Sequence, residues 1–330
     1  MPKNATRLGL IVKEFLEIFP TENKKTLARI ICQKHPDLKL EDVRRNIRYY
    51  TGAGGVVQRK IIKDRRFLRP ADGSYKTKLT PVNISVEDYI FPHKKPLILS
   101  DIHLPYHVLD ALEIALEKGY KEGVDSIYLN GDILDFYQIS RFTKEGGMMS
   151  IREERDMFFD LISWIRQSFD VPIYFKVGNH EERLEHYIMN KAPELASLPE
   201  LSLRQFLKLD ELGVEYISGR QKTLMGKLIT IHGHEFGDSV FSPVNPARGL
   251  FLRAKSSTAA GHNHQTSEHH ENNLKSDSMA CFSIGCLCQL TPMYRPFAYT
   301  KWNHGFAIPI IDKDGSFEFN NYRIIDGKAR

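Results

Sequence analysis

The feature that most constrains the fold is an alternation of short apolar runs and amphipathic segments after Pro96. The runs PLILS, DSIYLN and VPIYFKV begin at residues 96, 125 and 171 and have the length and composition of buried strands. Between them, residues 108–120 and 152–169 repeat apolar side chains at helical spacing. Strands that are apolar along their whole length and alternate with helices predict an α/β fold.

Two later segments predict antiparallel strands in the second half of the chain. Residues 222–233 and 304–325 each contain two runs of strand-forming residues, joined at Gly226 and at Asp314-Gly315 respectively. Glycine at such a junction is typical of a tight hairpin turn. We therefore expect a mixed sheet structure rather than a purely parallel one.

Polar side chains able to bind a metal ion follow each of the apolar strands. In chain order they are Asp101, His103, Asp132, Asp135, Asn179, His180, His232, His234, His262 and His264. The carboxyl ends of the strands in an α/β sheet meet at one crevice, so we expect these side chains to lie close together. Carboxylate and imidazole groups are ligands for divalent transition metals. The set predicts a metal centre.

Asp101 and His103 alone are weak evidence for a metal site. Taken singly, the pair also fits a polar loop at the end of a strand. In an extended segment, residues two apart point the same way, so both side chains could face one metal ion, but one pair cannot hold it. Only the partners elsewhere in the chain favour metal binding.

The polar segments read D-x-H, G-D-x-x-D, G-N-H-E, H-G-H and G-H-N-H between residues 101 and 264. In this order they resemble the calcineurin-like metallophosphoesterase family, over about residues 96–310. The resemblance implies a calcineurin-like β-sandwich flanked by helices. It also implies an enzyme that hydrolyses phosphoric esters with two divalent metal ions. We expect manganese, although iron, zinc, cobalt and nickel suit the same nitrogen and oxygen ligands.

The resemblance assigns a role to most of these side chains. Seven would hold the two metals: Asp101, His103 and His264 at the first, Asn179, His232 and His262 at the second, and Asp132 between them. A water shared by the two metals would lose its proton and attack the phosphorus. His180 would be the general acid for the leaving oxygen, and Asp135 would orient it. Helix capping is the alternative role for Asp135.

Two further residues are candidates for substrate binding. Arg141 follows the second strand's loop and could pair with a phosphate, although a surface position is equally compatible. His234 could contact phosphate or line the pocket. Serine/threonine phosphatases of the family carry Arg-Gly after G-D-x-x-D, whereas this chain has Phe136 and Tyr137. That departure argues against a protein phosphatase.

The first 80 residues differ in charge from the remainder. They carry 19 lysines and arginines against 8 aspartates and glutamates, a net charge of +11, whereas the other residues sum to −6. Helical spacing over 6–19, 23–35 and 40–50 predicts a small all-α, helix-turn-helix-like domain at residues 1–70. Residues 71–95, rich in proline, glycine, serine and threonine, read as a linker before a catalytic domain at 96–330.

The basic N-terminal region, residues 1–80 and called the head from here on, favours a nucleic-acid partner. Its positive side chains include Arg44, Arg45, Arg48, Arg65 and Arg66. We therefore expect a nuclease-like phosphodiesterase. The alternative is a phosphomonoesterase, acting on a small molecule, a nucleotide or a protein, whose head binds another protein. For the head, a helical bundle whose basic face is only solvated also fits the sequence. For the whole chain, a non-catalytic scaffold that binds nucleic acid is a further alternative.

The sequence favours a cytoplasmic protein. No run of about 18 apolar residues is present, and the N-terminus lacks the apolar core of a signal peptide. Three of the four cysteines lie in the apolar segment CFSIGCLC, and we expect them to be reduced core residues.

Overall fold

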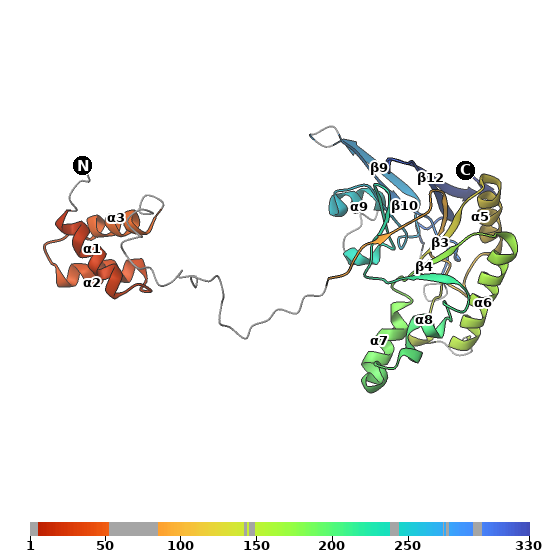
Figure 1. The fold of residues 1–330 in the computed structure, drawn as a ribbon, viewed down its shortest axis with the longest axis horizontal. Coiled ribbons are helices and arrows are strands. Elements are labelled where there is room, and N and C mark those ends of the chain that lie inside the picture. The colour runs from red at the N-terminus through yellow and green to blue at the C-terminus, as the bar shows by residue number, and fades with distance from the viewer. Residues whose placement is uncertain are drawn as a thin grey trace. The chain divides into compact units, whose positions relative to one another are not determined.

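The computed structural model describes residues 6–52, 85–141, 144, 149–237, 244–272, 274, 277–292 and 299–330. Contacts divide the chain into two compact units, Met1–Asn83 and Ile84–Arg330. Figure 1 draws both units. Arg65 and Arg66 of the predicted basic surface lie outside the described residues, as does the predicted linker up to residue 84.

The first unit contains the predicted helical region, which is confirmed. Its helices are α1 (Arg7–Ile18), α2 (Lys24–Lys34) and α3 (Leu40–Thr51). The side chains of Thr6 and Asn23 accept backbone hydrogen bonds at the starts of α1 and α2, which explains where these helices begin. The buried faces meet in a core of their own, built from Val12, Phe15, Leu16, Leu27, Ala28, Ile31, Val43, Ile47 and Tyr50.

The outer face of α3 carries the predicted basic residues. Arg44 lies 2.6 Å from Glu41, and Arg45 lies 2.6 Å from Asp42. Arg48 is exposed one turn further along the helix. Pairs of this kind contribute only about 0.3–0.5 kcal/mol at a helix surface, so both arginines can exchange their partner for another anion.

The second unit contains two sheets. The six-stranded sheet has the order β1-β6-β7-β8-β10-β9, and the seven-stranded sheet has the order β13-β12-β11-β2-β3-β4-β5. The strands of the first are β1 (Tyr89–Ile90), β6 (Thr223–Met225), β7 (Leu228–Ile231), β8 (Thr258–Ala260), β9 (Ser267–Asn272) and β10 (Ser278–Ser283). Those of the second are β2 (Pro96–Leu99), β3 (Ser126–Asn130), β4 (Ile173–Lys176), β5 (Val214–Ile217), β11 (Gly305–Ile311), β12 (Phe317–Ile325) and β13 (Lys328–Ala329).

The alternation of side chains along β2 explains why this strand is apolar throughout. Ile98 faces the other sheet and packs in a shared core with Met225 and Phe282. Leu97 and Leu99 face the opposite way, into a core shared with helices α5 (Leu109–Glu122) and α6 (Ile151–Ser168). Helix α9 (Pro246–Ala254) packs on the six-stranded sheet. Figure 1 shows these helices flanking the sheets. The predicted β-sandwich flanked by helices is confirmed.

Short helical segments connect the strands at one end of this sandwich. The turn η3 (Tyr137–Ile139) follows β3, and α7 (Glu182–Lys191) follows β4. After α7 come η4 (Pro193–Leu195), η5 (Pro199–Leu201) and α8 (Leu203–Phe206), and η6 (His234–Phe236) follows β7.

Both predicted hairpins are present. Gly226 joins β6 to β7 with a φ of 63°, and Gly315 joins β11 to β12 with a φ of 82°. Residues 89–91 differ from their assignment to the linker. Tyr89 and Ile90 form β1, which pairs with β6, and Phe91 is buried. So short a strand leaves no periodic signal in a segment whose composition is typical of loops.

The cysteines of the apolar segment lie in the interior. Cys281, Cys286 and Cys288 are buried and free of disulfides, as predicted. No helix among the described residues has both the length and the apolar character that crossing a membrane requires.

Candidate metal centre

The predicted ligands lie just beyond the carboxyl ends of five strands from both sheets. Asp101 follows β2, Asp132 follows β3 and Asn179 follows β4, whereas His232 follows β7 and His262 follows β8. Because β2, β3 and β4 run parallel, as do β7 and β8, their carboxyl ends share an edge. The structure brings these side chains into one cluster.

The backbone at these positions is unusual. Asp101, His103, Asp132, His262 and His264 all have φ between 52° and 65°. Left-handed φ is uncommon for residues other than glycine and marks sites where the surroundings hold a strained conformation. The strand β2 ends at Leu99, so alternation along a strand does not orient Asp101 and His103. Their direction comes from these left-handed turns instead, which corrects the reasoning from the sequence.

Asp132 occupies the middle of the cluster. Its Oδ2 lies 3.2 Å from Nε2 of His232, 3.8 Å from Nε2 of His103 and 3.8 Å from Nε2 of His180. Its Oδ1 accepts the backbone N–H of His180 at 2.9 Å. A carboxylate with ligand atoms on two sides is placed to contact two cations at once.

Two groups of donors flank Asp132. On one side, Nε2 of His264 lies 3.1 Å from Oδ1 of Asp101 and 3.2 Å from Nε2 of His103. On the other side, Oδ1 of Asn179 lies 3.2 Å from Nε2 of His232. Donor atoms of Asp132, His232 and His262 lie within 4.8 Å of one another. The resemblance assigned these same side chains to two metals, and a further group of donor atoms, from His103, Asp132 and His180, also lies within 4.8 Å.

The electrostatics of the cluster favour bound cations. Burial alone would raise the pKa of Asp101, but the neighbouring charge of His264 outweighs it and holds the pKa at about 2. The pKa of Asp132 is also lowered, since the charges of His180 and His232 oppose the effect of burial. The carboxylate of Asp132 in turn raises the pKa of His232 to about 10 despite burial. Ionised carboxylates fit divalent metal ions, and His232 would release its proton to bind one.

Asp135 contacts two histidines. Its Oδ1 lies 2.9 Å from Nδ1 of His103 and 3.2 Å from Nδ1 of His180, whose Nδ1 also donates to the backbone carbonyl of Asp135 at 2.9 Å. A carboxylate behind an imidazole fixes its orientation and tautomer. We infer that Asp135 orients the candidate ligand His103 as well as the candidate acid His180.

Glu181, the last residue of the G-N-H-E segment, is a buried residue to which reasoning from the sequence gave no role. Its carboxylate accepts backbone hydrogen bonds from Asp132, Ile133, Leu134 and Gly178, at 2.7–3.0 Å. These bonds join the loop after β3 to the loop after β4. One side chain therefore fixes the spacing between Asp132 and the Asn179-His180 segment.

Replacing Glu181 with alanine is expected to lower the free energy of unfolding by about 3 kcal/mol or more. Four buried N–H groups would lose their acceptor, and leaving a buried polar group unsatisfied costs about 1–3 kcal/mol. Urea unfolding monitored by circular dichroism measures the change. Glu194→Ala, at an exposed position of η4, is the control and should leave stability nearly unchanged. Equal stability of the two variants would contradict this role for Glu181.

A second carboxylate, that of Glu235, fixes the loop that carries His232. Glu235 accepts the backbone N–H groups of His232 and Gly233, and its Oε1 lies 3.2 Å from the buried Nζ of Lys176. His234, a candidate for substrate binding, lies with Nε2 3.4 Å from Oε1 of Glu182 at the start of α7. It therefore borders the cluster and connects this loop to α7.

The other substrate-binding candidate, Arg141, is exposed just after η3. The structure also adds Cys288, whose Sγ lies 3.8 Å from Nδ1 of His264. No metal-binding spacing in the sequence pointed to this thiol. Glycine explains how the loops approach so closely, because a Cβ at Gly261 would overlap the Ser100 hydroxyl.

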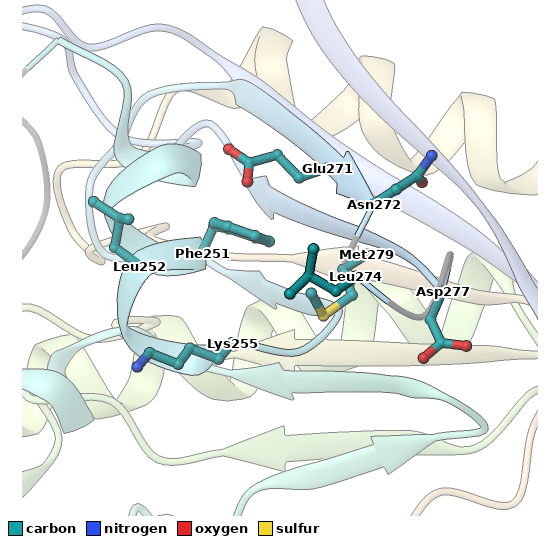
Figure 2. A pocket seen from close by; sticks show the side chains of 8 residues that line it. All are labelled: Phe251, Leu252, Lys255, Glu271, Asn272, Leu274, Asp277 and Met279. Carbon is teal, nitrogen blue, oxygen red and sulfur yellow. The ribbon is translucent and has the colours of Figure 1, made fainter.

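A separate pocket lies away from these ligands, between α9 and the β9–β10 pair (Figure 2). It is lined by Phe251, Leu252, Lys255, Glu271, Asn272, Leu274, Asp277 and Met279. None of the predicted site residues lines it, so the metal centre and this pocket are distinct.

Comparison with known proteins gives relatives and a family. The gene 54 protein of Mycobacterium phage L5 is 25% identical over 229 residues, which span 66% of this chain and 89% of that protein. Its counterpart in Mycobacterium phage D29 is 24% identical over the same length. A dimetal phosphatase from Danio rerio is 12% identical, with a TM-score of 0.36 over 71% of this chain and 96% of that one. The nuclease MPE of Pseudomonas putida is 10% identical, with a TM-score of 0.30 over 68% of this chain and 86% of that one. The model of the calcineurin-like phosphoesterase family matches residues 94–281, more than half of the sequence, and the chain belongs to that family.

Proposed function

We propose that this chain is a phosphoester hydrolase that uses two divalent metal ions, with manganese as the first choice. The observation that supports it most is the central position of Asp132 between two donor groups. Asp101, His103 and His264 would hold one ion, and Asn179, His232 and His262 the other. When bound, the ions would polarise the phosphoryl group and lower the pKa of a water molecule between them.

The residues of the chain supply the rest of the mechanism. His180 stands at the rim of the cluster, where its Nε2 would donate a proton to the leaving oxygen. Its Nδ1 is held by Asp135, so the ring cannot turn away. The backbone N–H of His180 also donates to Asp132, which ties the acid to the bridging carboxylate.

For the substrate, we propose a phosphodiester of nucleic acid. The net charge of +11 in the first 80 residues supports this choice, as does the exposed position of Arg45 and Arg48 on α3. One observation favours the alternative, a monoesterase whose head binds protein. The acids Glu41 and Asp42 neutralise part of the α3 surface, as on an ordinary solvated helix.

A screen of the full chain tests the hydrolase and its substrate. Metal-supplemented protein should hydrolyse bis(p-nitrophenyl) phosphate and cleave DNA or RNA, and EDTA should abolish both activities. A strong preference for p-nitrophenyl phosphate would instead support the monoesterase. Nucleic-acid binding that survives EDTA, with no hydrolysis under any metal, would support a scaffold and contradict the proposal.

The role of the head can be tested by salt dependence. The double variant Arg45→Gln/Arg48→Gln should reduce the slope of log affinity for double-stranded DNA against log salt by up to about 2, since each lost phosphate contact changes it by about 0.9. Fluorescence anisotropy measures this. Arg253→Gln/Lys313→Gln, at exposed sites of the second unit, removes the same charge and should leave the slope unchanged. If the two double variants behave alike, the head does not bind DNA through α3.

A further inference from the structure

Arg183 lies directly beside the candidate general acid. It occupies the first turn of α7, three residues after His180, and its side chain is only 18% exposed. Its Nη2 lies 2.8 Å from Nε2 of His180, and its Nη1 donates to the backbone carbonyl of Asp135 at 2.7 Å. The guanidinium therefore borders the place where a leaving group would depart.

Among the described residues, the hydrogen bonds of Arg183 go to uncharged groups, and its ion pair with Asp135 is long. Its two hydrogen-bond partners are an imidazole and a carbonyl. The carboxylate oxygen of Asp135 lies 3.9 Å away and is engaged more closely by His103 and His180. A largely buried cation with such partners is a strong binding position for an incoming anion, because arginine pairs bidentately with phosphate.

The position of Arg183 indicates which part of a substrate it would meet. Nε2 of His180 accepts an N–H of the guanidinium in this structure, whereas as the general acid it would carry a proton and face the leaving oxygen. A bound leaving oxygen therefore takes the place of Arg183 at Nε2, and the displaced guanidinium remains beside the leaving group. The scissile phosphoryl group would lie toward Asp132, whose Oδ2 is 3.8 Å from the same Nε2.

We propose that Arg183 forms an anion-binding subsite on the leaving-group side of the metal centre. The preferred substrates are then phosphodiesters whose leaving nucleoside carries a phosphate of its own, as inside a nucleic-acid strand. This inference rests on the proposed hydrolase function. It specifies on which side of the scissile bond the substrate carries its additional phosphate. This chain has Phe136 and Tyr137 in place of the Arg-Gly pair that serine/threonine phosphatases carry after G-D-x-x-D. Arg183 of α7 would nevertheless place an arginine near the site.

Three dinucleotides test the subsite: thymidylyl-thymidine (TpT) and its derivatives with one additional phosphate at the 5′ end (pTpT) or the 3′ end (TpTp). The products released from TpT identify which nucleoside leaves. The derivative with its phosphate on that nucleoside should have a kcat/KM about tenfold higher than TpT or more, as a charge-assisted bidentate contact allows. The derivative with its phosphate on the other side should show no such gain.

Variants assign the preference to Arg183. Arg183→Gln should reduce the ratio of the two kcat/KM values to about 1, and Arg183→Lys should retain part of it. Arg253→Gln, at an exposed site of α9, should retain all of it. Thermal unfolding and metal content show whether each variant is folded and loaded, and the ratio is insensitive to a general loss of rate.

The remaining outcomes of these assays would overturn either the subsite alone or the hydrolase function with it. Equal rates on the three dinucleotides, or a preference that survives Arg183→Gln, would overturn the subsite and leave the hydrolase function standing. Hydrolysis of p-nitrophenyl phosphate without cleavage of any dinucleotide would do the same. No hydrolysis of any of these compounds by metal-loaded protein would overturn the proposed function as well.

Discussion

Asp132→Asn is expected to lower kcat/KM for bis(p-nitrophenyl) phosphate by about three orders of magnitude or more, because two bound cations contribute several kcal/mol and each 1.36 kcal/mol is tenfold. The side chain lies between both donor groups, with Oδ2 3.2 Å from Nε2 of His232 and 3.8 Å from Nε2 of His103. An amide has the same shape but no charge, and its nitrogen cannot act as a ligand. Both ions lose the carboxylate that they would share.

Metal content separates this effect from a loss of folding. The Asp132→Asn protein should bind less than two equivalents of manganese after reconstitution, as measured by elemental analysis, while its circular dichroism stays native. Asp160→Asn on the exposed face of α6 makes the same chemical change and should alter neither quantity. Full metal occupancy with full activity in Asp132→Asn would remove the bridging role and, with it, the main support for the proposed function.

The sequence predicted the α/β sandwich and the place of the site because both depend on patterns local to each strand. A buried strand must be apolar on both faces, as Leu97, Ile98 and Leu99 show, and its carboxyl end is where polar residues can emerge. The direction of each side chain was not predictable in the same way. Left-handed backbone at Asp101 and His103 depends on neighbouring loops, such as the contact between Gly261 and Ser100.

The residues that the sequence did not reveal act through tertiary contacts. The G-N-H-E segment includes Glu181 but does not show its role, because its carboxylate accepts hydrogen bonds from backbone groups about 48 residues away. Cys288 approaches His264 only because the chain returns to the site after β10. Arg183 did leave a signal. It lies three residues after His180 at a helix start, and residues three apart share a helix face.

His180→Ala is expected to keep both metals and to lose about 10²–10⁴-fold in rate on TpT, the range that a general acid contributes. Metal binding should survive because the contact between residue 180 and Asp132 comes from the backbone N–H, which alanine retains. The loss should be smaller on bis(p-nitrophenyl) phosphate, whose leaving group departs readily without a proton. A dependence on the leaving group is the signature of an acid, and a purely structural role would slow both substrates equally.

His270→Ala supplies the matched comparison for this variant. His270 lies on β9, its side chain is 58% exposed, and its closest ionic partner is Glu268 at 3.4 Å. Removing that imidazole should change neither the rate on TpT nor the ratio between the two substrates. If His180→Ala instead loses bound manganese in elemental analysis, the imidazole is a ligand rather than an acid. The 3.8 Å separation between Nε2 of His180 and Oδ2 of Asp132 would then mark a coordination site, and the proton for the leaving group would have to come from elsewhere.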